Sequence, residues 1–260
     1  MRLLPSTTQL ATALAAVTLL AAAAGPAAAA AAPIKNIVLV HGAFVGGSGW
    51  RPVYDILVKD GYHVTLVQEP LTSYADDVTA TKRILERQDG PTVLVGHSYG
   101  GAIITTAGND EHVKALVYIA AHALDVGETE ASNGKKYPNL TKSIVKTADG
   151  FLFLNPDNYP ADFAADLPRA EAEFEAHAQM PTSASVFTTL LPGEPAWKTK
   201  PSWYMVAKAD HIINPDLERM YAARAHSHTV EIDGASHSVY ESHPKEVAAL
   251  IEQAALHAGD

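Results

Sequence analysis

The sequence contains no cysteine among its 260 residues. That absence excludes disulfide bonds, thiolate nucleophiles, cysteine-ligated zinc and lipid attachment through an N-terminal cysteine. Positive charge is also scarce, because 19 Lys and Arg stand against 29 Asp and Glu, for a net charge of −10. No run of Lys or Arg forms a basic stripe. Nucleic acid and anionic membrane surfaces are therefore not expected as partners.

Charge is missing from the start of the chain as well. Arg2 is the only charged residue before Lys35, and between them lie an apolar stretch (10–24), a Gly-Pro break and an alanine tract. A short basic start, an apolar middle and small residues are typical of a secretory signal peptide, and an uncleaved membrane anchor is the alternative. We expect residues 1–32 to be cleaved near Ala30–Ala32. The mature protein would then be periplasmic or secreted, with no stable membrane association.

The remaining chain, residues 33–260, is predicted to form one α/β domain. Its length and a hydrophobic content of 47% suit a single large core. Short apolar runs alternate with helical patterns, and six of these runs are predicted strands: 36–40, 63–67, 91–95, 114–120, 202–207 and 228–232. This alternation predicts a mainly parallel six-stranded sheet with helices on both faces.

Helix ends can also be located. Ser73 is a suitable cap for a helix running to about residue 88, with Asp76 and Asp77 in its first turn, where the helix dipole favours anions. Pro244 is well placed at the first position of a last helix that runs to about residue 257.

Residues 121–200 lack the alternation. A structureless loop of this length is improbable in a compact domain, and the segment contains helix-like pieces such as 168–179. We therefore predict an inserted helical lid at about 121–200. Several of its aromatic residues are candidates for lining an apolar pocket or for packing on the core: Phe151, Phe153, Tyr159, Phe163, Phe174, Phe187 and Trp197.

One short motif predicts a nucleophile. The sequence VGHSYGG follows the apolar run 91–95, and it places Ser98 between a strand and a helix with Gly96 and Gly100 on either side. This G-x-S-x-G pattern is the nucleophile elbow. Its sharp turn needs glycines because side chains would clash there, and it exposes the serine hydroxyl above the sheet.

A serine hydroxyl needs a base and an orienting acid. Among twelve histidines, His237 follows the last predicted strand and so lies at the sheet edge where ligands bind. Asp210 follows the fifth strand and is the preferred acid, with Asp125 after the fourth strand as the alternative. The order Ser98, Asp210, His237 is that of the hydrolases and differs from both familiar protease orders.

The loop HGAFVGGSGW after the first strand supplies an anion site. We expect the backbone N–H groups of Ala43 and Tyr99 to face a developing oxyanion, with His41 and Gly42 shaping the loop. A metal role for the pair His226 and His228 is not expected, because no further ligands stand at a suitable spacing.

Four motifs, LVHGAFVGGSGW, VGHSYGG, AKADHIINP and GASHSVYESHP, give the chain a resemblance to the α/β-hydrolases from Ile34 onward. It is most similar to the small-esterase branch, which includes plant methyl-salicylate esterases, hydroxynitrile lyases and many bacterial esterases. The resemblance implies cofactor-free hydrolysis of small esters through an acyl-enzyme, with Ser98, Asp210 and His237 as the catalytic triad.

Other activities occur in proteins of this kind. The similar hydroxynitrile lyases carry threonine where Gly42 stands and lysine where Ser238 stands, so a lyase is disfavoured. Dehalogenases and epoxide hydrolases place aspartate at the elbow, which Ser98 excludes. Cofactor-free dioxygenases, C–C hydrolases and non-catalytic binding proteins remain alternatives to the esterase. A short apolar or aryl ester is the expected substrate.

Overall fold

The computed structural model describes Met1 and residues 33–258. Six strands form a sheet in the order β2-β1-β3-β4-β8-β9, and every neighbouring pair is parallel. The strands are β1 (Asn36–Val40), β2 (His63–Leu66), β3 (Thr92–His97), β4 (Val113–Ile119), β8 (Ser202–Ala207) and β9 (His228–Ile232). The predicted fold class is therefore confirmed.

The sheet is buried on both faces. In β1, Ile37 and Leu39 point into one hydrophobic core, whereas Val38 and Val40 point into the other. Successive side chains of a strand alternate between faces, so an uninterrupted apolar run such as this one is what a strand covered on both sides requires.

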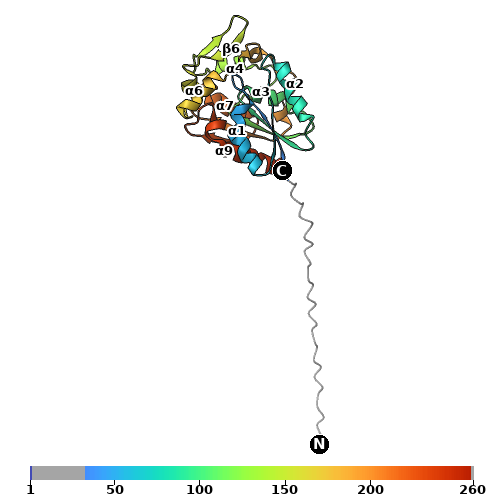
Figure 1. The fold of residues 1–260 in the computed structure, drawn as a ribbon. Coiled ribbons are helices and arrows are strands. Elements are labelled where there is room, and N and C mark those ends of the chain that lie inside the picture. The colour runs from blue at the N-terminus through green and yellow to red at the C-terminus, as the bar shows by residue number, and fades with distance from the viewer. Residues whose placement is uncertain (2–32, 259–260) are drawn as a thin grey trace. The chain divides into compact units, whose positions relative to one another are not determined.

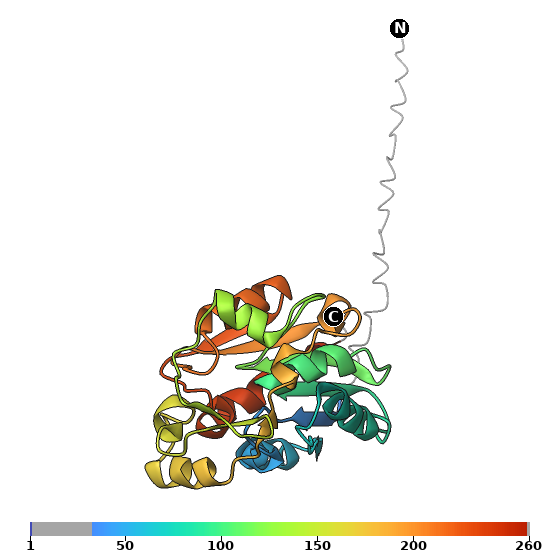
Figure 2. The same ribbon diagram turned by 90° about the horizontal axis from the view of Figure 1, so that it is seen from above.

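Helices cover each face (Figures 1 and 2). The core of Ile37 and Leu39 also contains buried residues of α1 (Arg51–Lys59) and α9 (Pro244–His257). The opposite core contains residues of α2 (Tyr74–Leu85), α3 (Tyr99–Ala107) and α7 (Pro215–Arg224). The result is a three-layer domain in which only Ser98 separates β3 from α3.

Two predicted helix starts are confirmed. The Ser73 hydroxyl accepts a hydrogen bond from the backbone N–H of Asp76, and Asp76 and Asp77 lie in the first turn of α2. Pro244 opens α9, where its missing N–H is not needed. The first of these helices ends at Leu85, three residues earlier than the sequence suggested.

The segment between β4 and β8 contains more than helices. Helices α4 (Glu130–Lys136), α5 (Tyr159–Asp162) and α6 (Arg169–His177) alternate with β5 (Ile144–Lys146), β6 (Phe151–Leu154) and β7 (Thr182–Ser183). These strands form a separate antiparallel sheet in the order β5-β6-β7. The expectation of helical pieces alone was therefore incomplete. Strands of two to four residues are too short to give a period of two in the sequence.

The predicted signal peptide, residues 1–32, lies outside the described residues apart from Met1, and it stays a prediction. In the part of the chain that the structure describes, no helix has both the length and the apolar character needed to cross a membrane. A short helix, α8 (Val239–Ser242), precedes α9.

Candidate active site

Three strands deliver the predicted triad to one edge of the sheet. Ser98 directly follows β3, Asp210 follows β8, and His237 follows β9. Because all three strands are parallel, their carboxyl ends meet at the same edge, where α/β proteins bind ligands. Residues far apart in the sequence are thereby brought together.

The turn at Ser98 is sharp and strained. Ser98 has φ 53° and ψ −124°, a conformation that a residue with a side chain rarely adopts. The glycines on either side are required by close backbone contacts. A Cβ on Gly96 would lie 2.6 Å from the carbonyl oxygen of Gly100, and one on Gly100 would lie 2.5 Å from that of His41. The turn therefore has the geometry that the motif predicted.

Ser98, His237 and Asp210 form one hydrogen-bonded row. His237 Nε2 lies 2.8 Å from Ser98 Oγ, and His237 Nδ1 lies 2.5 Å from Asp210 Oδ2. The second oxygen of Asp210 accepts backbone N–H groups from Ile212 at 2.6 Å and Ile213 at 2.9 Å. The side chains of Asp210 and His237 have no solvent exposure. Since the carboxylate accepts from Nδ1–H, Nε2 is left to accept the serine proton.

His97 holds the histidine loop in place, a contact that sequence reasoning missed. Its Nε2 lies 2.9 Å from the backbone carbonyl of His237 and donates to it, and the two rings are 4.7 Å apart. Burial, and next the neighbouring His237, lower the pKa of His97 well below its usual value. A neutral His97 therefore anchors the loop without adding a charge beside His237.

Glu218 on α7 is a buried neighbour of the Asp210 carboxylate. Burial, reinforced by the negative charge of Asp210, raises the pKa of Glu218 well above its ordinary value. Its Oε2 accepts the backbone N–H of Ala207 at 3.0 Å. A raised pKa favours the uncharged form of Glu218 beside the Asp210 carboxylate.

The two expected oxyanion donors have free N–H groups. Among the described residues, no hydrogen-bond partner is found for the backbone N–H of Ala43 or of Tyr99. Tyr99 is the first residue of α3, so its N–H has no acceptor within the helix. The side chain of Tyr99 points elsewhere, because its hydroxyl donates to Asp77 at 2.8 Å. His41 is neutral, since burial lowers its pKa to about 4, and it ties this loop to Glu69 by accepting the backbone N–H.

The other predicted residues lie outside this row. Asp125, the alternative acid, forms an ion pair of 2.8 Å with Lys198 and its side chain is 33% exposed. His243, which directly precedes α9 and was not singled out from the sequence, makes no capping hydrogen bond, and its Nε2 lies 3.4 Å from Asp166 Oδ2. Within residues 33–258, no three His, Asp or Glu side chains are grouped so as to hold a metal ion.

Ser98 and Ala43 line a cavity of about 490 Å³. Apolar side chains contribute most of its wall, including Phe44, Leu152 and Leu217, and the exposed Lys135 is also present. Of the aromatic residues that sequence analysis singled out, Phe187 lines this cavity, whereas Tyr159 and Phe163 are buried in the core and Phe174 is 67% exposed. The cavity brings Ser98 into contact with an apolar space.

The chain belongs to the alpha/beta hydrolase family, whose sequence pattern matches residues 37–250. It is 26% identical to Methylesterase 18 of Arabidopsis thaliana, over 85% of this chain and 97% of that protein. Its fold is similar to that of a pyrethroid hydrolase (TM-score 0.76, 22% identity, 87% of this chain and 100% of the other). Polyneuridine aldehyde esterase is also similar (TM-score 0.72, 18% identity, 85% and 98%). The predicted resemblance to the esterase branch is confirmed.

Proposed function

We propose that this hydrolase is a serine carboxylesterase that cleaves small apolar or aryl esters through an acyl-enzyme. The single observation that carries the proposal is the row in which His237 bridges Ser98 and Asp210, at 2.8 and 2.5 Å. A nucleophile in contact with a base, which is itself held by a buried acid, is the arrangement that acyl transfer needs.

The chemistry follows from this arrangement. His237 Nε2 takes the proton of Ser98 as Oγ attacks the ester carbonyl, and the developing oxyanion is held by the N–H groups of Ala43 and Tyr99. The Asp210 carboxylate stabilises the imidazolium that forms. The C–O bond then breaks, and His237 returns the proton to the departing alkoxide. Water, deprotonated by His237, then attacks the acyl carbonyl. The bond between the acyl carbon and Ser98 Oγ breaks, His237 returns the proton to Oγ, and the acid is released.

The cavity supports small substrates with apolar groups. Its volume of about 490 Å³ lies in the range of small-molecule sites. Phe44 and Phe187, stacked with ring centroids 5.9 Å apart, form part of its wall. Aromatic and aliphatic lining favours acyl or aryl groups that lose contact with water on binding.

The loop geometry disfavours the lyase alternative. A Cβ on Gly42 would lie 2.7 Å from the Cβ of Ser98, so the threonine of the similar lyases does not fit here without displacing the nucleophile. Ser238, where those lyases carry lysine, is buried. A binding protein without catalysis has no need of an intact row of nucleophile, base and acid.

A fluorophosphonate probe tests the proposal directly. We expect the folded protein to be labelled stoichiometrically at Ser98, because the probe captures only a serine that its base has activated. Intact mass and peptide mapping measure the site. Heat-unfolded protein and Ser98→Ala are the controls, and both are expected to remain unlabelled. Folded protein that takes up no probe at Ser98 would contradict the acyl-enzyme route.

A further inference from the structure

The insert between β4 and β8 binds both backbone groups of Phe44, the residue that follows Ala43. The Phe44 N–H donates to Thr182 Oγ1 at 3.0 Å, and the Phe44 carbonyl accepts the N–H of Met180 at 3.0 Å. Thr182 is the first residue of β7 and is fully buried. Its hydroxyl lies 3.3 Å from the Met180 carbonyl and donates to it. Two residues of the insert therefore hold the loop that follows β1.

This contact maintains a strained backbone at Phe44. Its φ is 69°, in the left-handed region that a residue with a side chain rarely adopts. Such a conformation persists only where the surrounding contacts impose it. Besides the two hydrogen bonds, the ring of Phe44 packs on that of Phe187 in the insert, with centroids 5.9 Å apart. Without these contacts Phe44 would relax toward negative φ, and the peptide group between Ala43 and Phe44 would turn.

His41 holds the peptide group on the other side of Ala43. The N–H of Glu69 donates to His41 Nε2 at 3.0 Å, so this nitrogen carries no proton. His41 Nδ1 is then the nitrogen that carries the proton of the ring, and it donates to the Gly42 carbonyl at 2.9 Å. The peptide between Gly42 and Ala43 is trans, so the Ala43 N–H points away from the carbonyl that His41 holds.

We propose that Thr182 is a positioning residue for the oxyanion site. Thr182 fixes the peptide group after Ala43, and His41 fixes the one before it. With both peptide groups held, the Ala43 N–H keeps one direction before a substrate arrives. Donors that need no reorganisation at the moment of reaction are what the stabilisation of an oxyanion requires. This inference rests on the proposed function and gives a residue of the insert a role in it.

Thr182→Val tests the role of the hydroxyl, because valine has nearly the shape of threonine and lacks the acceptor. The buried N–H of Phe44 would lose its partner, which costs free energy, and the peptide group after Ala43 is expected to turn. We expect kcat for p-nitrophenyl butyrate to fall about tenfold with KM within about twofold of wild type, a part of the ~10²–10³-fold loss that removal of a whole oxyanion donor causes. Thr182→Ser restores the acceptor, and its kcat should lie within about threefold of wild type.

Inhibition by propylboronic acid gives a second readout that is specific to the oxyanion site. Ser98 Oγ adds to the boron atom, and the tetrahedral adduct places an oxygen where the oxyanion of the butyrate ester would be. Thr182→Val is expected to raise the inhibition constant by about fivefold or more, because an analogue of the transition state depends on the donors more than the substrate does. Neither this constant nor KM depends on how much of a preparation is folded, so a merely structural role of Thr182 does not separate them.

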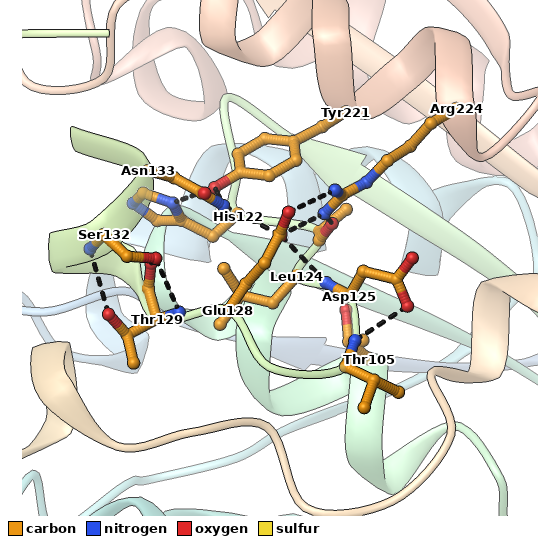
Figure 3. Close-up of polar contacts among 12 residues, drawn as sticks. Thr105, His122, Leu124, Asp125, Glu128, Thr129, Ser132, Asn133, Tyr221 and Arg224 are labelled. Carbon is orange, nitrogen blue, oxygen red and sulfur yellow. Dashed lines mark hydrogen bonds and ion pairs between the residues drawn. The ribbon is translucent and has the colours of Figure 1, made fainter. Parts of the chain in front are cut away.

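Two other variants of the insert serve as controls. Thr147→Val removes a bond of the same kind between β5 and β6, where Thr147 Oγ1 accepts the N–H of Phe151 at 2.9 Å. Asn133→Ala loosens the attachment of the insert to α7, where Asn133 Nδ2 lies 2.8 Å from Glu128 Oε2 and 3.0 Å from the Tyr221 hydroxyl (Figure 3). Neither set of bonds involves the loop after β1, so both variants should keep the inhibition constant of wild type.

A kcat and an inhibition constant that both stay within about twofold of wild type in Thr182→Val would overturn this inference alone. An inhibition constant and a KM that rise by the same factor would also overturn it, because they would show a general disturbance of the cavity. Thr182→Ala removes the same oxygen and replaces the valine variant if that one does not fold. Absence of hydrolysis and of fluorophosphonate labelling in wild-type protein would overturn the proposed function and this inference with it, so the two failures are distinguishable.

Discussion

Ser98→Ala and His237→Ala are each expected to lower kcat/KM for p-nitrophenyl butyrate by about a thousandfold or more. The first change removes the atom that attacks, and the second removes the base that lies 2.8 Å from it. Initial rates of p-nitrophenolate release measure the effect. Residual hydrolysis above the rate in water would come from the oxyanion donors and from substrate binding.

The double variant Ser98→Ala/His237→Ala provides the control for this interpretation. Nucleophile and base act as a unit, so the double variant should lose little more activity than either single variant. Thermal unfolding should show that all three variants are folded. Turnover near the wild-type rate in either single variant would refute the catalytic assignment, and multiplied losses in the double variant would argue against a shared step.

Asp210→Asn is expected to lower kcat/KM by about a thousandfold or more, as the same change does in serine proteases. The backbone N–H groups of Ile212 and Ile213 donate to Asp210 Oδ1, and they would hold the amide oxygen of the variant in that position. The amide nitrogen would then face His237 Nδ1 and donate to it. The ring would be forced into the tautomer with a proton on Nε2, which cannot accept the serine proton.

Asp125→Asn is the matched control for this substitution. Asp125 pairs with Lys198 at the surface, and a partly exposed pair of this kind contributes roughly 0–1 kcal/mol to stability. The variant should retain activity within about twofold of wild type by the same p-nitrophenolate assay. A larger loss in Asp125→Asn than in Asp210→Asn would reverse the choice of acid.

The central sheet could be predicted from the sequence because its strands are strong local signals. Residues 202–207 and 228–232 were located to the residue as β8 and β9, since an apolar or alternating run between turn residues is sufficient. The strands of the insert could not be found this way. β6 is an apolar run of only four residues, and β5 has three residues that are exposed along their length, so both are too short to be told from loop residues.

Motifs indicated which residues to test, whereas tertiary contacts supplied their partners. Ser98 stands out because its turn needs glycines at fixed positions. The choice between Asp210 and Asp125 has no local signal, because both follow strands. Asn133 on α4 and Tyr221 on α7 lie far apart in the sequence, and their hydrogen bond forms only in the folded chain. The sequence signal for the role of His97 is its position directly before Ser98 in the elbow motif.

His237, the proposed base, follows β9, which is an edge strand of the sheet. Among the described strands, β9 pairs only with β8, and all five of its residues are at least partly exposed, whereas Ser98 follows β3 in the middle of the sheet. Local opening of an edge strand requires less free energy than global unfolding. We therefore expect mild heating to abolish hydrolysis before the circular dichroism of the sheet changes. Loss of activity would then report the detachment of β9 and not the unfolding of the whole domain. Coincident loss of both signals would contradict this expectation.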